Sequence, residues 1–142
     1  MPIFLDHLII PSKNRRAAAE LISELLGVPW SEQSKFGPFS QVFLNGDSTL
    51  DFDEWLEPIP KGHYCFRVSN AEFDQIVARL RIRNLPYRST PHGPVDFQTN
   101  SIFGGQLLYW DQPDGHVWEV LTVSYERQNE EDASAMSERA DR

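Results

Sequence analysis

Apolar and polar positions alternate along the first half of the chain in a pattern that predicts four secondary-structure elements. They are a strand, a helix and two further strands, at residues 4–10, 15–26, 39–44 and 49–55. Asn14 has a side chain suited to capping the beginning of the helix, and Gly27 marks its end. Because the apolar residues of the helix lie three and four positions apart, we expect one face of it to be buried.

The second half of the chain repeats this order after a loop rich in proline and glycine. A strand, a helix, an irregular segment and two strands follow one another, at residues 62–68, 70–83, 89–105, 106–110 and 117–123. Ser69 and Glu72 form a capping-box pattern at the beginning of the helix. Pro113-Asp114-Gly115 predicts a tight turn between the last two strands, which would then form a β-hairpin.

The two halves also repeat chemically distinctive residues. His7 and His63 each lie in the first strand of a half, and each precedes an asparagine by seven residues. Each half then ends in a strand that carries an acid, Asp51 or Glu119. Internal repetition is a strong fold signal. We therefore interpret the chain as an α+β protein, in which two βαβββ modules form a curved mixed sheet around a cavity with the helices on its outer face.

The module boundary is expected in the loop between the two halves. The first module would span residues 1–57 and the second residues 58–125. Residues 126–142 are mostly polar and acidic and carry too few apolar side chains to offset the entropy of ordering. We expect them to form an acidic flexible tail.

The composition and charge of the chain argue against several classes of function. The 142 residues carry a net charge of −8, which argues against nucleic acid as a partner because phosphate binding needs clustered lysine and arginine. No apolar run approaches the ~20 residues of a membrane span, and residues 3–10 lack the basic leader of a signal peptide. A single cysteine, Cys65, excludes an internal disulfide. We expect a cytoplasmic protein with no membrane and no nucleic-acid partner.

The repeated polar residues suggest a metal site. Glu119 lies between Trp118 and Val120, where an ionised carboxylate needs a positive partner. Two imidazoles and one carboxylate suit a divalent transition metal and leave coordination positions open for a substrate. His7, His63 and Glu119 are therefore candidate ligands of one divalent ion (Fe, Mn, Ni, Zn or Co).

Other interpretations of these side chains remain open. A lone histidine in an apolar strand is more often a hydrogen-bonded core residue than a ligand. Alternation places Arg67 on the face of Glu119, so Arg67 is either the partner of that carboxylate or a binding group for an anionic substrate. Trp110 is a candidate wall of the substrate pocket, or alternatively a core or interface aromatic. His116 lies three residues before Glu119, so strand alternation places its side chain on the opposite face, and we expect it to be exposed.

Three segments, taken in order, resemble the vicinal oxygen chelate superfamily, which includes glyoxalase I, fosfomycin-resistance thiol transferases, extradiol dioxygenases and bleomycin-resistance proteins. They are Leu5-Asp-His-Leu, Gly62-His-Tyr-Cys-Phe and the Asp-x-Pro-Asp-Gly-His-x-x-Glu run at 111–119. The resemblance spans residues 3–124. It implies metal ligands at His7, His63 and Glu119.

The resemblance also bears on Asp51, which stands near the position of a fourth ligand, a glutamate, in glyoxalase I. Aspartate is one methylene shorter than glutamate and reaches less far toward a metal. From its position, Asp51 is a candidate catalytic base or fourth ligand. We expect a glyoxalase- or dioxygenase-like enzyme, a metal-dependent lyase, isomerase or dioxygenase, that chelates a small substrate through adjacent oxygens. We also expect a homodimer, with the modules paired either within one chain or across the dimer. The alternative is a metal-free protein that sequesters a small molecule, as bleomycin-resistance proteins do.

Overall fold

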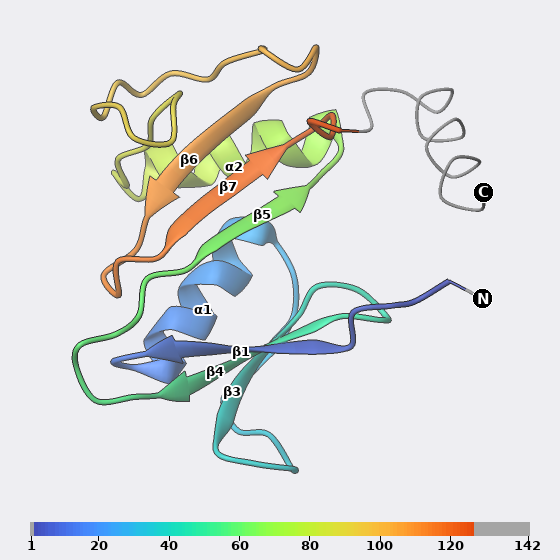
Figure 1. Cartoon of the computed structure of the whole chain (residues 1–142), viewed down its shortest axis with the longest axis vertical. Coiled ribbons are helices and arrows are strands. Elements are labelled where there is room, and N and C mark those ends of the chain that lie inside the picture. The colour runs from blue at the N-terminus through green and yellow to red at the C-terminus, as the bar shows by residue number, and fades with distance from the viewer. Residues whose placement is uncertain (1, 127–142) are drawn as a thin grey trace. The chain divides into compact units, whose positions relative to one another are not determined.

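The computed structural model describes residues 2–126, and its strands and helices form an α+β protein (Figure 1). The α+β class predicted from the sequence is confirmed. The described strands make two small mixed sheets, neither of which closes into a barrel. Apart from Glu126, the expected acidic tail lies outside the described residues. Within the described range, no helix has the length and apolar character needed to cross a membrane.

The chain divides into two compact units. The first contains the chain up to Gly62 together with Gln112–His116, and the second contains His63–Asp111 and the chain from Val117 onward. The division therefore falls between residues 62 and 63, whereas the sequence predicted a boundary between 57 and 58. The turn Gln112–His116 belongs to the first unit, although the strands that it joins belong to the second.

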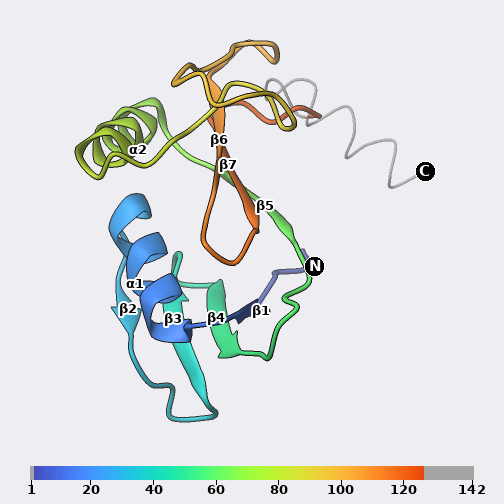
Figure 2. The same cartoon turned by 90° about the vertical axis from the view of Figure 1, so that its left-hand side faces the viewer.

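The first unit has the order βαβββ. Its elements are β1 (His7–Ser12), α1 (Arg15–Leu26), β2 (Trp30–Ser31), β3 (Phe39–Phe43) and β4 (Thr49–Glu54). The sheet order is β1-β4-β3-β2, in which β1 and β4 are parallel and the other pairs are antiparallel. Figure 2 shows α1 lying against one side of this sheet. Apolar side chains of β1 and β4 that face α1 are fully buried, among them Ile10 and Phe52.

The capping signals in the sequence explain the bounds of α1. Asn14 Oδ1 accepts a hydrogen bond from the backbone N–H of Ala17 at 3.0 Å. Gly27 has φ 72°, and its N–H donates to the carbonyl of Ser23 at 2.8 Å. A residue with a Cβ adopts this left-handed conformation only with strain, so the helix ends where the glycine stands.

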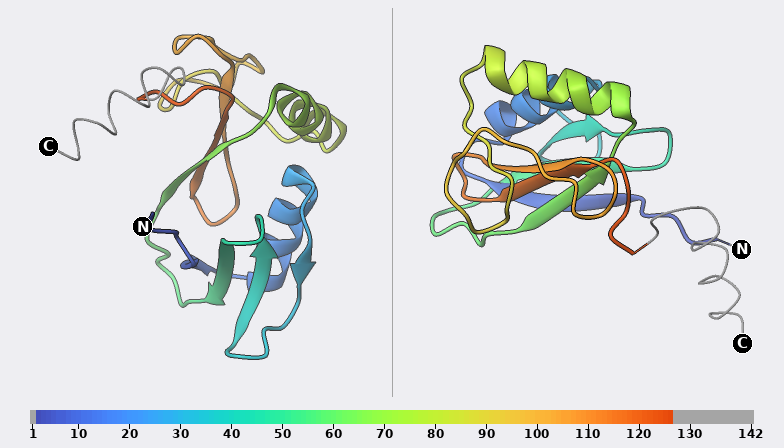
Figure 3. Two further views of the ribbon diagram at one scale, coloured as in Figure 1. Left: turned by 90° about the vertical axis from the view of Figure 1, so that its right-hand side faces the viewer. Right: turned by 90° about the horizontal axis from the view of Figure 1, so that it is seen from above.

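The second unit has three named strands instead of four. Its elements are β5 (His63–Arg67), α2 (Asn70–Ile82), β6 (Leu107–Asp111) and β7 (Val117–Leu121). The sheet order is β5-β7-β6, with β5 parallel to β7, and α2 lies to one side of it (Figure 3). Isolated bridges from Arg88 to Tyr109 and from Asn100 to Leu107 place the irregular segment beside β6. This segment takes the place that β2 has beside β3 in the first unit.

The buried Arg88, at the beginning of the irregular segment, makes hydrogen bonds to β6. The Arg88 guanidinium donates to both carboxylate oxygens of Asp111, at 2.9 and 3.1 Å, and to the carbonyl of Pro91. All three nitrogens of the guanidinium are thereby satisfied, which removes most of the cost of burying the charge. The segment is held in place by this arginine rather than by a continuous ladder of backbone hydrogen bonds.

Candidate functional site

In the second unit, a histidine and a glutamate come together on one face of the sheet. Glu119 stands in β7, with Cys65 of β5 and Tyr109 of β6 as its neighbours in register. His63 Nε2 donates to Glu119 Oε1 at 2.9 Å. The glutamate is 7% exposed, whereas about half of the His63 side chain is open to solvent. The hydrogen-bond partner of Glu119 is therefore the His63 imidazole rather than Arg67.

The Glu119 carboxylate also affects its two neighbours in the sheet. Partial burial, followed by the charge of Glu119 and a hydrogen bond to it, raises the pKa of the Cys65 thiol to about 12. The same causes, burial first, raise the pKa of Tyr109 to about 12. Both groups keep their protons at neutral pH and donate to the carboxylate. Glu119 thus has three donors around it.

In the first unit, His7 and Asp51 lie along one pocket of about 350 Å³ on the sheet. His7 Nδ1 donates to Asp6 Oδ2 at 2.7 Å, and this bond, with a smaller contribution from the charge of Asp51, raises the pKa of His7. Asp51 is 7% exposed and accepts a hydrogen bond from Gln41 Nε2 at 3.1 Å. With Nδ1 engaged by Asp6, Nε2 of His7 is the ring nitrogen left to bind a ligand.

The two histidine–acid pairs occupy equivalent positions in the two sheets. Asp51 is paired in register with Ile9, and Glu119 is paired with Cys65. Each histidine lies two residues before the residue that pairs with the acid, so it is on the same face of a parallel strand pair. The repeat read from the sequence therefore corresponds to an equivalent geometry in each unit.

The four side chains are divided between the units. His7 and Asp51 belong to the first, and His63 and Glu119 to the second. Among the residues that the structure describes, neither unit by itself gathers three or more histidine, cysteine, aspartate or glutamate side chains in a group suited to a metal. A common site for His7, His63 and Glu119 stays a prediction.

The structure separates the two candidate substrate-binding residues. Arg67 is exposed and lines an open hollow of about 530 Å³ together with Cys65 and Tyr125. Trp110 is 0% exposed and is paired in register with Trp118, on the face of the sheet opposite Glu119. This placement does not agree with the role predicted for Trp110. Tyr109 is the aromatic residue of β6 on the Glu119 face.

The expectation for His116 was wrong. The residue is 1% exposed; its Nε2 donates to the carbonyl of Pro11 at 2.7 Å, and its Nδ1 accepts from the N–H of Gly62 at 2.9 Å. Strand parity predicted only that His116 does not face Glu119. It gave no sign of two backbone partners so distant in the sequence.

Comparison with known proteins gives matches among solved structures only: no protein-family profile and no curated sequence matches the chain. Oxidase ChaP-H1 is 35% identical, over 87% of this chain and 98% of that chain, with a TM-score of 0.80. Oxidase ChaP-H2 is 31% identical, over 91% of this chain and 100% of that chain, with a TM-score of 0.84. A lactoylglutathione lyase from Agrobacterium tumefaciens shares the fold, at 18% identity over 85% and 94% of the two chains and a TM-score of 0.62.

Proposed function

Because the chain belongs to the vicinal oxygen chelate superfamily, we propose that it is a metal-dependent enzyme that holds a small substrate through two adjacent oxygens. Among the structures that it resembles, the two oxidases at 35% and 31% identity support an enzymatic activity. Among the reactions considered, we favour a dioxygenase-like oxidation over a glyoxalase-like isomerisation. The two structures reported above at more than 30% identity carry the name oxidase, whereas the lyase shares only the fold.

Each unit contributes side chains of the types that bind a divalent metal. The observation that supports the proposal most directly is the 2.9 Å contact between His63 Nε2 and Glu119 Oε1, because it brings atoms of two proposed ligands together. We propose His7, His63 and Glu119 as the ligands, a donor set typical of Fe, Mn, Co, Ni or Zn. A divalent ion bound there would supply Lewis acidity toward the substrate oxygens.

The surrounding residues have separate roles in this proposal. Gln41 Nε2 donates a hydrogen bond to Oδ1 of the buried Asp51 carboxylate. The other oxygen of Asp51, Oδ2, would then accept a proton from the substrate or act as a fourth ligand. Tyr109 keeps its proton and orients Glu119. Arg67, exposed at the end of β5, presents a planar cation to an anionic group of the substrate. The surface around His63 stays open, so a substrate has access to it.

Metal analysis tests the proposal. The protein is loaded with Fe²⁺, Mn²⁺ or Zn²⁺, desalted and analysed for bound metal as wild type, His63→Ala and Glu119→Gln. We expect close to one ion per chain in the wild type. Loss of a group that only orients a ligand lowers metal affinity by about 10–100-fold. Because His63 and Glu119 are proposed as ligands themselves, we expect the metal affinity of each variant to fall by at least this factor.

The matched control is His92→Ala, which removes an exposed histidine from the loop after α2 and should leave the metal content unchanged. Absence of bound metal from the wild type would end the metalloenzyme interpretation and favour the metal-free binding protein. Equal metal content in the wild type, His63→Ala and Glu119→Gln would show that these two residues are not ligands. Oxygen uptake with a panel of catechols then tests the reaction class. Metal binding without oxygen uptake would leave the site in place and remove the oxidase assignment for those substrates.

A further inference from the structure

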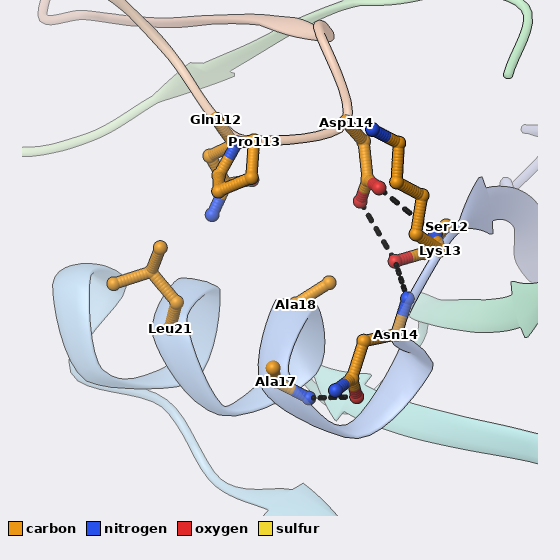
Figure 4. Close-up of a pocket in the computed structure, with 9 residues that line it drawn as sticks. All are labelled: Ser12, Lys13, Asn14, Ala17, Ala18, Leu21, Gln112, Pro113 and Asp114. Carbon is orange, nitrogen blue, oxygen red and sulfur yellow. Dashed lines mark hydrogen bonds between the residues drawn. The ribbon is translucent and has the colours of Figure 1, made fainter.

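A small apolar pocket lies in the first unit between the beginning of α1 and the turn that starts at Gln112 (Figure 4). Its volume is about 160 Å³, and Ala17, Ala18 and Leu21 of α1 face Pro113 of the turn across it. An apolar cavity of ~150 Å³ holds one benzene ring. The pocket is therefore large enough for a molecule built on a single ring.

The polar groups at the rim of the pocket satisfy one another. The Asp114 carboxylate accepts from Ser12 Oγ at 2.7 Å and from the N–H of Lys13 at 2.8 Å. The Lys13 ammonium lies 2.5 Å from a carboxylate oxygen of Glu57. These bonds fix the turn on the end of β1 and leave neither charge at the rim without a partner.

Gln112 is different, because its side-chain nitrogen is buried without a partner. The residue is 7% exposed, and Nε2 is inaccessible to solvent and makes no hydrogen bond. Figure 4 shows this side chain pointing from the turn toward α1. A buried amide donor without an acceptor is unfavourable, and such groups are rare in folded proteins. A rotation of the Gln112 side chain toward the pocket would expose Nε2 to an acceptor brought by a ligand, and this hydrogen bond would remove the cost.

We propose that this pocket binds a small, uncharged, single-ring molecule whose carbonyl oxygen accepts a hydrogen bond from Gln112 Nε2. The apolar lining takes the ring, and the buried donor sets its orientation. An anion is disfavoured because the Asp114 carboxylate stands at the rim and the Lys13 ammonium is engaged by Glu57. The pocket is separate from the pocket of His7 and Asp51, since α1 covers the other face of the first sheet.

Nuclear magnetic resonance with a matched pair of probes tests the proposal. Acetophenone carries a ring and a carbonyl, whereas ethylbenzene has nearly the same shape without the oxygen. In the full-length wild type, acetophenone should shift the side-chain amide signals of Gln112 and the backbone amide of Ala18. It should bind about tenfold more tightly than ethylbenzene, the ratio expected of one hydrogen bond to an otherwise unsatisfied donor.

Two variants separate the hydrogen bond from the cavity. Gln112→Leu keeps the size of the side chain and removes the donor, so both probes should bind it equally. Ala18→Leu fills the pocket with a residue that favours helix, so neither probe should bind it. Absence of acetophenone binding to the wild type, or acetophenone affinity unchanged by Gln112→Leu, would overturn the proposal. If Gln112→Leu does not fold, the Gln112 amide shift in the wild type and its loss in Ala18→Leu decide the question.

Discussion

His116 connects three parts of the first unit through its ring nitrogens. It lies in the turn after β6, and its partners are the carbonyl of Pro11 in β1 and the N–H of Gly62 just before β5. The ring therefore donates from Nε2 and accepts at Nδ1. The two bonds give the carbonyl of Pro11 and the N–H of Gly62 a hydrogen-bond partner in place of water.

We predict that His116→Ala lowers the free energy of unfolding by about 1–3 kcal/mol, because it leaves buried backbone groups without a partner. Urea unfolding followed by fluorescence measures the change. His92→Ala, at an exposed position, is the control and should change stability by less than about 0.5 kcal/mol. Equal stability of the two variants would contradict a structural role for His116.

Asp96 introduces a pH dependence into the irregular segment. Its carboxylate accepts from the hydroxyl and the N–H of Ser89 and from the N–H of Gln98. These bonds, that to the Ser89 hydroxyl first, lower the pKa of Asp96. A carboxyl with a lowered pKa in the folded state stabilises the fold above its unfolded pKa, ~3.9, and loses that contribution as the pH falls through the folded value.

We therefore expect Asp96→Asn to reduce stability at pH 6 and to reduce the loss of stability between pH 5 and pH 2. Urea unfolding at several pH values compares the wild type with the variant. Asp74→Asn, on an exposed position of α2, serves as the reference for a change of charge alone. The hypothesis fails if the difference between wild type and Asp96→Asn does not change with pH.

At the scale of the elements, the end of α1 depends on the backbone conformation of one residue. Gly27 has φ 72°, so Gly27→Ala should destabilise the protein by roughly 1 kcal/mol. The control is Gly46→Ala in the turn between β3 and β4, where an added Cβ would meet nothing within 4 Å. Thermal unfolding of both variants measures the difference. A similar melting temperature for the two would show that the cap conformation carries no cost.

Elements with a strong local signal were predicted well, and those that depend on distant partners were not. The bounds of α1 are those predicted, because capping and apolar spacing act within the helix. Strand β1 was predicted at residues 4–10 and lies at His7–Ser12, since its pairing with β4 determines where it begins. The two-residue strand β2 was missed; it is a strand only through its pairing with β3.

At the scale of the whole molecule, we keep the prediction of a homodimer. The single chain exposes several large apolar side chains, including Phe36 and Leu56, each 93% exposed. We propose that these side chains belong to an association surface, which requires them to lie in one contiguous patch. Sedimentation velocity at micromolar concentration should give twice the mass of one chain. A species with the mass of one chain, up to high concentration, would show that the protein is a monomer.

If the protein is a dimer, mixing two variants shows how the proposed ligands are shared. When His7 of one chain and His63 of its partner hold the same ion, mixed dimers of His7→Ala and His63→Ala regain one intact site of two. When both ligands come from one chain, no intact site forms. Bound metal in the exchanged mixture, compared with each variant alone, distinguishes the two arrangements.

The sequence by itself determined the α+β class, both helices and the repeated histidine–acid pairs, because propensity, capping and strand alternation act over a few residues. Only the tertiary structure decided that Glu119 takes His63 rather than Arg67 as its partner, and that Trp110 lies on the opposite face. It also decided that His116 is buried and that the Gln112 amide faces an apolar pocket. Burial and hydrogen bonding depend on neighbours far apart along the chain, and a local pattern contains no information about them.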